Sequence, residues 1–434
     1  MRVQDDSDTS YHTRGKQTLK RGGMFYTAQS GIWQSVWYEW VPKNYVKSYR
    51  ITPDYDHACV KIELVSADKF KDIEITLDDA NVLNEVRTTE TNGGTVTEIV
   101  VRFVEGQFQA WSPETPHLYY FTLRAGDDVI RSYFAMRSFT IEKDEKGIPR
   151  FCLNHKPYFL HGILDQGYWP DGLLTAPSDE AFVFDIELVK KLGFNMIRKH
   201  IKIEPLRWYY HCDRLGVIVW QDMVNGGTTY NMPWVCYMPT ALPFLGKKIK
   251  DNAYHMFSRK SEEGRKLWEK ECMDTIEHLY NVPSLATWVP FNEAWGQFDA
   301  ARIALDVKAK DPTRTVDHAS GWFDQGEGDF NSVHNYFRAL RVEKDDKRAF
   351  VISEYGGYAC HIQGHSSVER VFGYKKYESL EELSMAYHKL MEKQVKPLVE
   401  AGLSGAVYTQ VSDIEEEVNG LVTYDRKVIK IVSS

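Results

Sequence analysis

The chain has 434 residues and a formal net charge of −8, and 43% of its residues are hydrophobic. A length of this size predicts about two or three domains. The modest negative charge and the absence of any large basic cluster exclude nucleic acid as an expected partner. No apolar run of about 18 residues exists and the first twenty residues are polar, so neither a membrane span nor a secretory signal is expected.

The six cysteines are widely scattered, and none forms a C-x-x-C pair. This usage is typical of a reduced, cytoplasmic protein, and that location is the one we predict. No set of His, Cys and carboxylate residues shows the spacing of metal ligands, so neither a metal nor a cofactor is expected.

Residues 1–42 end in the aromatic stretch YTAQSGIWQSVWYEWVP, which has β character but is too short for a core of its own. We interpret it as the last part of a larger domain. Residues 43–142 then alternate between short apolar strands and turn-rich links, which is typical of a β-sandwich. The expected strands are residues 58–65, 73–77, 96–103, 118–124 and 133–141.

Residues 143–434 show a different pattern, in which apolar strands alternate with longer helical stretches. This alternation predicts parallel βαβ units. Eight strands in about 290 residues favour a closed (β/α)8 barrel. The expected strands are residues 158–163, 195–199, 217–223, 285–291, 313–318, 332–335, 350–353 and 404–410. The expected helices include residues 179–192, 205–215, 261–280, 300–310 and 380–401.

Two glutamates each end a strand of this predicted barrel. WVPFNEAWG carries Glu293 at the end of strand four, and AFVISEYGG carries Glu354 at the end of strand seven. Active sites of such barrels are built at the carboxyl ends of the strands, so both acids should lie on one rim. A single glutamate after a strand is more often a solvated surface charge, but two of them on one rim favour a catalytic pair.

Glycoside cleavage needs one carboxylic acid to protonate the departing oxygen and one carboxylate to attack the anomeric carbon or activate water. Glu293 and Glu354 can supply both groups without a metal. A separation of about 5 to 5.5 Å indicates the retaining route, and about 6.5 to 9.5 Å indicates inversion. The sequence leaves this choice open.

The motifs resemble glycoside hydrolase family 2, the family of β-galactosidases, β-glucuronidases and β-mannosidases. The resemblance covers nearly the whole chain. It rests on QSGIWQSVW, FLHGILDQGYW, LGFNMIRKHIKIEP, CDRLGVIVWQDM, both glutamate motifs and NGLVTYDRK. It implies a jelly-roll sugar-binding domain, of which residues 1–42 would be a remnant, then an immunoglobulin-like β-sandwich and the catalytic barrel.

The resemblance also implies a role for each candidate site residue. Glu293 would be the general acid/base and Glu354 the nucleophile of a retaining double displacement. Asn292 would hold the 2-hydroxyl of the sugar, while Arg198 and Tyr336 would bind the carboxylate of Glu354. The remaining candidates would line the pocket, with Tyr408 as an aromatic platform; they are His200, His334, Tyr408 and Trp322. A structural ion pair for Arg198, and core packing for the histidines and the two aromatic residues, are the competing interpretations.

The sugar is chosen mainly by exclusion. Glucuronidases of the family carry an Asn-x-Lys clamp before the segment that matches NGLVTYDRK, whereas this chain has EEEVNG, which would repel a glucuronate carboxylate. We therefore expect an exo-β-glycosidase that acts on β-galactosides, with β-glucosides, β-mannosides or arabinosides as open alternatives. An inactive or carbohydrate-binding fragment is the competing hypothesis. The short N-terminal part should leave Trp33 and Trp37 uncovered, and such a patch also allows a homo-oligomer.

Overall fold

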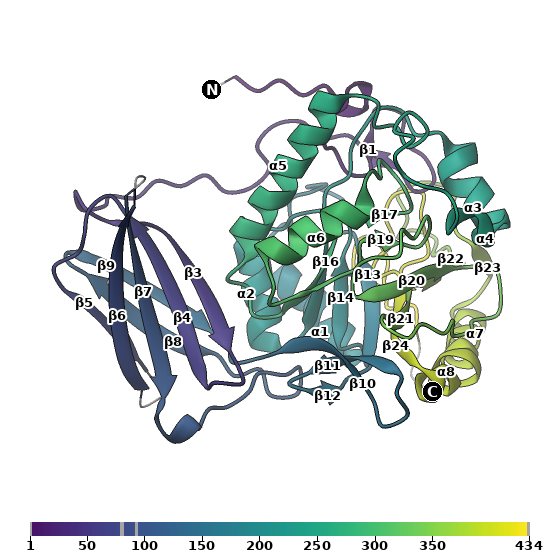
Figure 1. The fold of residues 1–434 in the computed structure, drawn as a ribbon. Helices are drawn as coiled ribbons and strands as arrows, with labels where there is room; N and C mark the ends of the chain where they lie inside the picture. Colours follow the sequence, from purple (N-terminus) through teal and green to yellow (C-terminus); the bar gives the residue numbers. More distant parts are fainter. Residues whose placement is uncertain (1, 79–81, 92–93, 432–434) are drawn as a thin grey trace.

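The computed structural model describes residues 2–78, 82–91 and 94–431. A β-sandwich lies beside a larger barrel, and the N-terminal segment runs from the upper end of the barrel across to the sandwich (Figure 1).

The sandwich has two antiparallel sheets with strand orders β3-β4-β7-β6 and β5-β8-β9. Alternate side chains of β4, such as Val60, Ile62 and Leu64, are fully buried between the sheets, as the period of a strand requires. The strands are β3 (Val46–Asp54), β4 (Cys59–Ser66), β5 (Ile73–Leu77), β6 (Val82–Thr91), β7 (Gly94–Phe103), β8 (Tyr119–Ala125) and β9 (Asp128–Phe134). A short 3-10 turn, η2 (Val104–Gly106), follows β7.

The expected strand over residues 133–141 is in fact divided. β9 ends at Phe134. β10 (Phe139–Lys143) pairs with β11 (Pro149–Leu153), and β11 pairs with β12 (Lys156–Pro157), in a separate sheet drawn below the barrel in Figure 1. Strands β3 and β6, which the sequence pattern missed, contain many polar residues and pair with β4 and β7. Their place in the sheet is therefore decided by their neighbours rather than by their own composition.

Eight parallel strands form the barrel wall in the order β18-β16-β15-β14-β13-β24-β21-β20. Within the described part of the chain, no ladder joins β18 to β20, but β17 and β19 pair just above them. The strands are β13 (Leu160–Asp165), β14 (Met196–Lys199), β15 (Ile218–Asp222), β16 (Leu285–Val289), β17 (Phe291–Asn292), β18 (Thr315–Val316), β19 (Ala319–Ser320), β20 (Phe330–Asn335), β21 (Ala349–Gly356) and β24 (Leu403–Thr409). The expected sandwich and (β/α)8 barrel are confirmed.

Helices cover the outside of the barrel, and several begin at side-chain caps. The hydroxyls of Ser178, Ser261 and Ser379 accept hydrogen bonds from backbone N–H groups three residues later. The helices are α1 (Asp179–Lys191), α2 (Leu206–Leu215), α3 (Met238–Ala241), α4 (Pro243–Gly246), α5 (Glu262–Leu279), α6 (Ala300–Lys310), α7 (Leu380–Leu390) and α8 (Lys396–Ala401). The π-helical turns η3 (Pro233–Tyr237) and η4 (Met391–Val395) and the short strands β22 (Tyr358–Cys360) and β23 (Lys375–Tyr377) complete the barrel domain.

The N-terminal segment lies across the barrel mouth. It contains η1 (Ser7–Thr9), β1 (Gln17–Thr18) and β2 (Tyr26–Thr27), and the two strands pair with each other in parallel. The backbone N–H groups of Arg14 and Gly15 both donate to the carbonyl of Asn225, which follows β15. This part of the chain is therefore attached to the loops that surround the carboxyl ends of the barrel strands.

The aromatic residues that follow are unequally covered. Trp33 is half-buried, and the ammonium of Lys202 lies 5.0 Å from the centroid of its ring. Trp37 and Trp40 are 74% and 94% exposed. The expected apolar patch therefore exists at Trp37 but not at Trp33.

Candidate active site

The two predicted glutamates meet inside the barrel mouth. A carboxylate oxygen of Glu293 and one of Glu354 lie within 4.8 Å of each other, together with a ring nitrogen of His334. Both glutamates are only 4% exposed. Because they come from β21 and from the turn after β17, only closure of the barrel brings them together.

The backbone of Glu293 is unusual for a residue that carries a side chain. Its φ is 49° and that of Ala294 is 61°, both in the left-handed region. Such conformations cost about 1–3 kcal/mol and persist only where the surroundings enforce them. The N–H of Glu293 donates to the carbonyl of Ser320 at 3.0 Å, which fixes the turn and directs the carboxylate into the mouth.

The carboxylate of Glu354 is held by donors on both of its oxygens. The hydroxyl of Tyr336 donates to Oε2 at 2.5 Å, and Nη1 of Arg198 donates to Oε1 at 3.3 Å. Burial raises the pKa of Glu354, but its electrostatic interactions with His334 and Arg198 outweigh the effect of burial and lower the pKa to about 2. Glu354 is therefore ionised at neutral pH, as a nucleophile must be.

Arg198 is fully buried and connects several site residues. Its Nε and Nη2 donate to the two carboxylate oxygens of Asp222 at 2.8 and 3.0 Å. Nη2 also donates to Oδ1 of Asn292 at 2.8 Å. Because arginine only donates, the oxygen of Asn292 must face it, and the Nδ2 group of Asn292 is left without a partner among the described residues. That amide is a free donor for a bound hydroxyl.

The two candidate histidines have different partners. Nδ1 of His334 lies 2.8 Å from Oε1 of Glu293, and its Nε2 lies 3.1 Å from the hydroxyl of Ser320. Nδ1 of His200 lies 2.6 Å from Oδ2 of Asp222. Burial lowers the pKa of His200 well below its usual value, so this ring is neutral at pH 7. Since the carboxylate of Asp222 accepts, Nδ1 of His200 donates and Nε2 remains as an acceptor.

The two aromatic candidates fall in different places. Trp322 is half-buried at the mouth, with its ring 5.9 Å from that of His334. Tyr408 corrects the expectation of a platform, because it is fully buried and its ring contacts Tyr387 of α7 at 5.2 Å. Successive residues of a strand point to opposite faces, so Tyr408 faces the helices while Thr409 faces the site, 3.0 Å from the hydroxyl of Tyr336.

Several residues of the mouth were missed in the sequence. Asp222 ends strand β15, so the WQDM motif carried a signal for it. Lys16 and Tyr26 of the N-terminal segment gave no signal, because nothing local links them to the barrel. The hydroxyl of Tyr26 donates to Glu417, and Nδ2 of Asn419 donates to the other oxygen of Glu417 at 3.0 Å.

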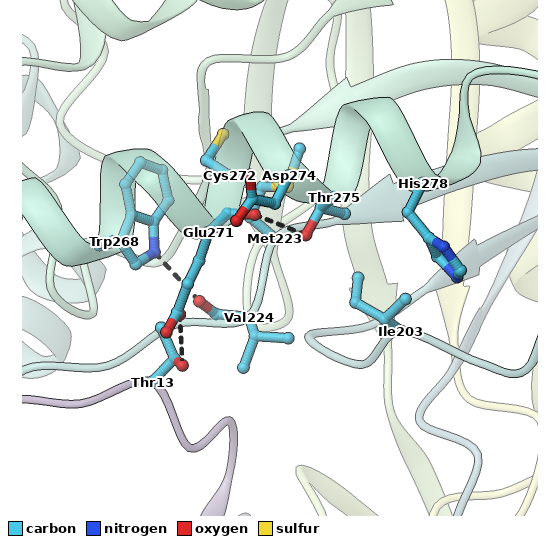
Figure 2. Close-up of a pocket in the computed structure, with 10 residues that line it drawn as sticks. All are labelled: Thr13, Ile203, Met223, Val224, Trp268, Glu271, Cys272, Asp274, Thr275 and His278. Atoms are coloured by element: carbon cyan, nitrogen blue, oxygen red, sulfur yellow. Dashed lines mark hydrogen bonds between the residues drawn. The ribbon is translucent and has the colours of Figure 1, made fainter. Parts of the chain in front are cut away.

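A separate cavity of about 350 Å³ lies beside α5, between that helix and the N-terminal segment (Figure 2). Thr13 and Glu271 form a hydrogen bond of 2.5 Å across its edge. None of the candidate site residues lines this cavity; its lining is Thr13, Ile203, Met223, Val224, Trp268, Glu271, Cys272, Asp274, Thr275 and His278. The candidate catalytic pair therefore lies at the barrel mouth, apart from this cavity.

Glu293, His334 and Glu354 together have the geometry of a possible three-ligand metal set, which the sequence spacing did not indicate. Two of these ligand atoms already bond to each other, and two carboxylates need no metal to cleave a glycoside. We expect dialysis against EDTA to leave kcat/KM on an aryl β-glycoside unchanged within about twofold. A loss that one divalent cation restores would contradict this prediction.

Comparison with protein families agrees with this geometry. The model of the glycosyl hydrolases family 2 TIM barrel domain matches residues 146–430, and a second model of glycosyl hydrolases family 2 matches residues 44–137. The two matches fall on the barrel and on the β-sandwich, respectively. The chain belongs to glycoside hydrolase family 2, so the predicted resemblance is confirmed.

Curated relatives carry more than one activity in their names. A beta-galactosidase of Lactococcus lactis subsp. lactis is 27% identical over 51% of this chain and 22% of its own length. A putative beta-glucuronidase of Formosa agariphila is 24% identical over 77% of this chain and 41% of its own length. The chain thus spans less than half the length of these relatives.

Among solved structures, a GH2 beta-galacturonidase from Eisenbergiella tayi bound to galacturonate matches with a TM-score of 0.59 and 18% identity. The match covers 89% of this chain and 70% of that one. At this identity the likeness supports the fold alone. In the described residues, no helix has the length and apolar character that crossing a membrane requires.

Proposed function

We propose that this chain is a retaining exo-β-glycosidase that hydrolyses terminal β-galactosides through a covalent glycosyl-enzyme. The observation that carries the proposal is the approach of the carboxylates of Glu293 and Glu354 to within 4.8 Å. That separation matches the short spacing of retaining enzymes, because inverting enzymes need about 6.5 to 9.5 Å to admit a water molecule.

In the first step, Glu354 attacks the anomeric carbon while Glu293 gives its proton to the glycosidic oxygen, and the aglycone leaves. In the second step, Glu293 takes a proton from water, and that water displaces Glu354 from the sugar. Arg198 and Tyr336 keep Glu354 ionised and correctly oriented. The free Nδ2 of Asn292 donates to the 2-hydroxyl, where a bond that strengthens in the transition state lowers the barrier.

The choice of a neutral sugar rests on the charge of the mouth. Of the three glutamates in EEEVNG, Glu415 and Glu416 pair with Arg21 at 3.4 and 3.3 Å. Arg21 therefore offsets one of these two negative charges, and the rest of the repulsion of a sugar carboxylate comes from Glu417 and from ionised Glu354. This is a weaker exclusion of uronosides than the sequence suggested, and β-glucosides, β-mannosides and arabinosides also stay open. A cytoplasmic location and self-association remain predictions.

The proposal is tested with a panel of p-nitrophenyl glycosides, followed by proton NMR of the first sugar released. We expect the β-galactoside to be cleaved fastest and the β-anomer of galactose to form first. Initial formation of the α-anomer would contradict retention. Thermal stabilisation by galactose without any hydrolysis would favour the competing hypothesis of an inactive, carbohydrate-binding fragment.

A further inference from the structure

Lys16 is a largely buried lysine of the N-terminal segment, and none of the described residues lies close enough to pair with its ammonium. It is 7% exposed. Its ammonium lies 5.2 Å from the ring centroid of Trp295 and 6.0 Å from that of Tyr26. Among the described residues, its ammonium forms neither a hydrogen bond nor an ion pair within 4.0 Å. The rest of the side chain is covered by protein, so water or a bound molecule is the expected partner of this ammonium.

The position of this ammonium relates it to the catalytic nucleophile. Its charge acts on Glu354 and on Glu417, and it lowers the pKa of each against the larger opposing effect of burial. Its neighbours place it at the same mouth, because Tyr26 bonds to Glu417 and Trp295 follows Glu293 by two residues. A sugar whose anomeric carbon Glu354 can reach would therefore lie close to Lys16.

The backbone holds Lys16 in place independently of its side chain. The carbonyl of Lys16 accepts from the N–H of Tyr26 at 3.0 Å. Gly15 before it has a φ of 68°, and a Cβ there would lie 3.1 Å from the carbonyl oxygen of Ile201. The close approach to the loop after β14 therefore favours glycine, and it places the next residue over the mouth.

We propose that Lys16 is a substrate-binding residue that sets specificity for a neutral terminal sugar, with its ammonium donating to a hydroxyl oxygen while Glu417 accepts from a hydroxyl. This inference rests on the proposed glycosidase function. Lysine can only donate and a carboxylate can only accept, whereas a sugar hydroxyl does both, so the two groups suit a neutral polyol. A uronate carboxylate could use Lys16 but would face Glu354 and Glu417.

The test compares Lys16→Met, which keeps the length of the side chain and its packing on Trp295, with Lys20→Met on the exposed part of the same segment. We expect Lys16→Met to lower kcat/KM on p-nitrophenyl β-galactoside by about 10- to 100-fold, the range for a lost hydrogen bond to a charged group. The thermal midpoint should not fall. Lys20→Met should leave kcat/KM unchanged.

Deoxygenated substrates separate binding from a structural effect. We compare kcat/KM of wild type and of Lys16→Met on the 3-, 4- and 6-deoxy-β-galactosides. On one of these substrates the two enzymes should have nearly equal kcat/KM, because that substrate lacks the hydroxyl that Lys16 binds. An equal loss on all of these substrates would overturn the inference. A larger loss on β-galacturonides than on β-galactosides would also overturn it, since Lys16 would then bind a carboxylate.

A binding measurement separates this inference from the proposed function. If the wild-type chain hydrolyses no glycoside, calorimetric titration with galactose still tests Lys16. Weaker galactose binding by Lys16→Met, with binding by Lys20→Met unchanged, would support the inference in that case. Equal binding by wild type and Lys16→Met would overturn it.

Discussion

Replacing Glu354 with Gln is expected to lower kcat on p-nitrophenyl β-galactoside by on the order of 10⁴-fold or more, because the amide cannot attack the anomeric carbon. The fold should persist. The amide oxygen can accept from Arg198, and the amide N–H can donate to the hydroxyl oxygen of Tyr336, so neither current partner is left unpaired. Initial rates and a thermal unfolding curve measure the two effects.

Two further variants make the result specific. Glu400→Gln, on the exposed surface of α8, is the matched control and should keep full activity. Glu293→Gln should lose most activity on alkyl glycosides but much less on the first step with a 2,4-dinitrophenyl glycoside, whose leaving group needs no proton. Full activity of Glu354→Gln, or the same leaving-group pattern in both variants, would contradict the assigned roles.

Replacing Arg198 with Ala is expected to destabilise the protein by about 3–5 kcal/mol, the usual cost of removing one partner from a buried ion pair. The guanidinium is fully buried and bonds to both Asp222 and Glu354, so its loss leaves two buried carboxylates without their cation. The change is measured as the difference in the free energy of unfolding between wild type and Arg198→Ala, from urea denaturation of the barrel. Activity should also fall, because Glu354 and Asn292 lose a common anchor.

The difference in stability between wild type and Arg198→Ala should depend on pH in a definite direction. The pKa of Glu354 is about 2 in the folded wild type, against a usual value of 4.5. Its ionised form therefore contributes stability above about pH 4.5, and this contribution is lost as the pH falls toward 2. The gap in stability between wild type and Arg198→Ala should narrow over that window.

Arg207→Ala is the matched control for Arg198→Ala, since Arg207 pairs with Asp179 where both side chains are 45% exposed. An exposed pair of this kind contributes about 0–1 kcal/mol. An equal loss of stability in the two arginine variants would contradict the inference that Arg198 stabilises the buried network.

Most of the barrel could be predicted because its signals are local. The strand Leu285–Val289 is buried at every position and apolar at all but Thr287, as expected of a strand covered on both faces, and α5 begins at a serine followed by two glutamates. The carboxyl ends of such strands are where a barrel places its chemistry, so Glu293 and Glu354 could be selected before any coordinates. Counting strands then placed both acids on one rim.

Strand register and long-range contacts explain the features that were not predicted correctly from the sequence. Tyr408 was assigned to the site although the alternation along β24 turns it outward, and a strand boundary that is uncertain by one residue is enough to reverse that choice. The strand expected over residues 133–141 was divided because β10 pairs with β11, a partner that local composition does not reveal.

The amino-acid order by itself determined the two-domain plan and the identity of the paired glutamates, because hydrophobic period and strand ends are properties of neighbouring residues. Only the tertiary structure decided which distant groups share the mouth. Tyr26 bonds to Glu417, and the charge of Lys16 acts on Glu354, although more than 300 residues separate the partners in each pair. Such contacts arise from packing between segments, and no spacing along the sequence encodes them.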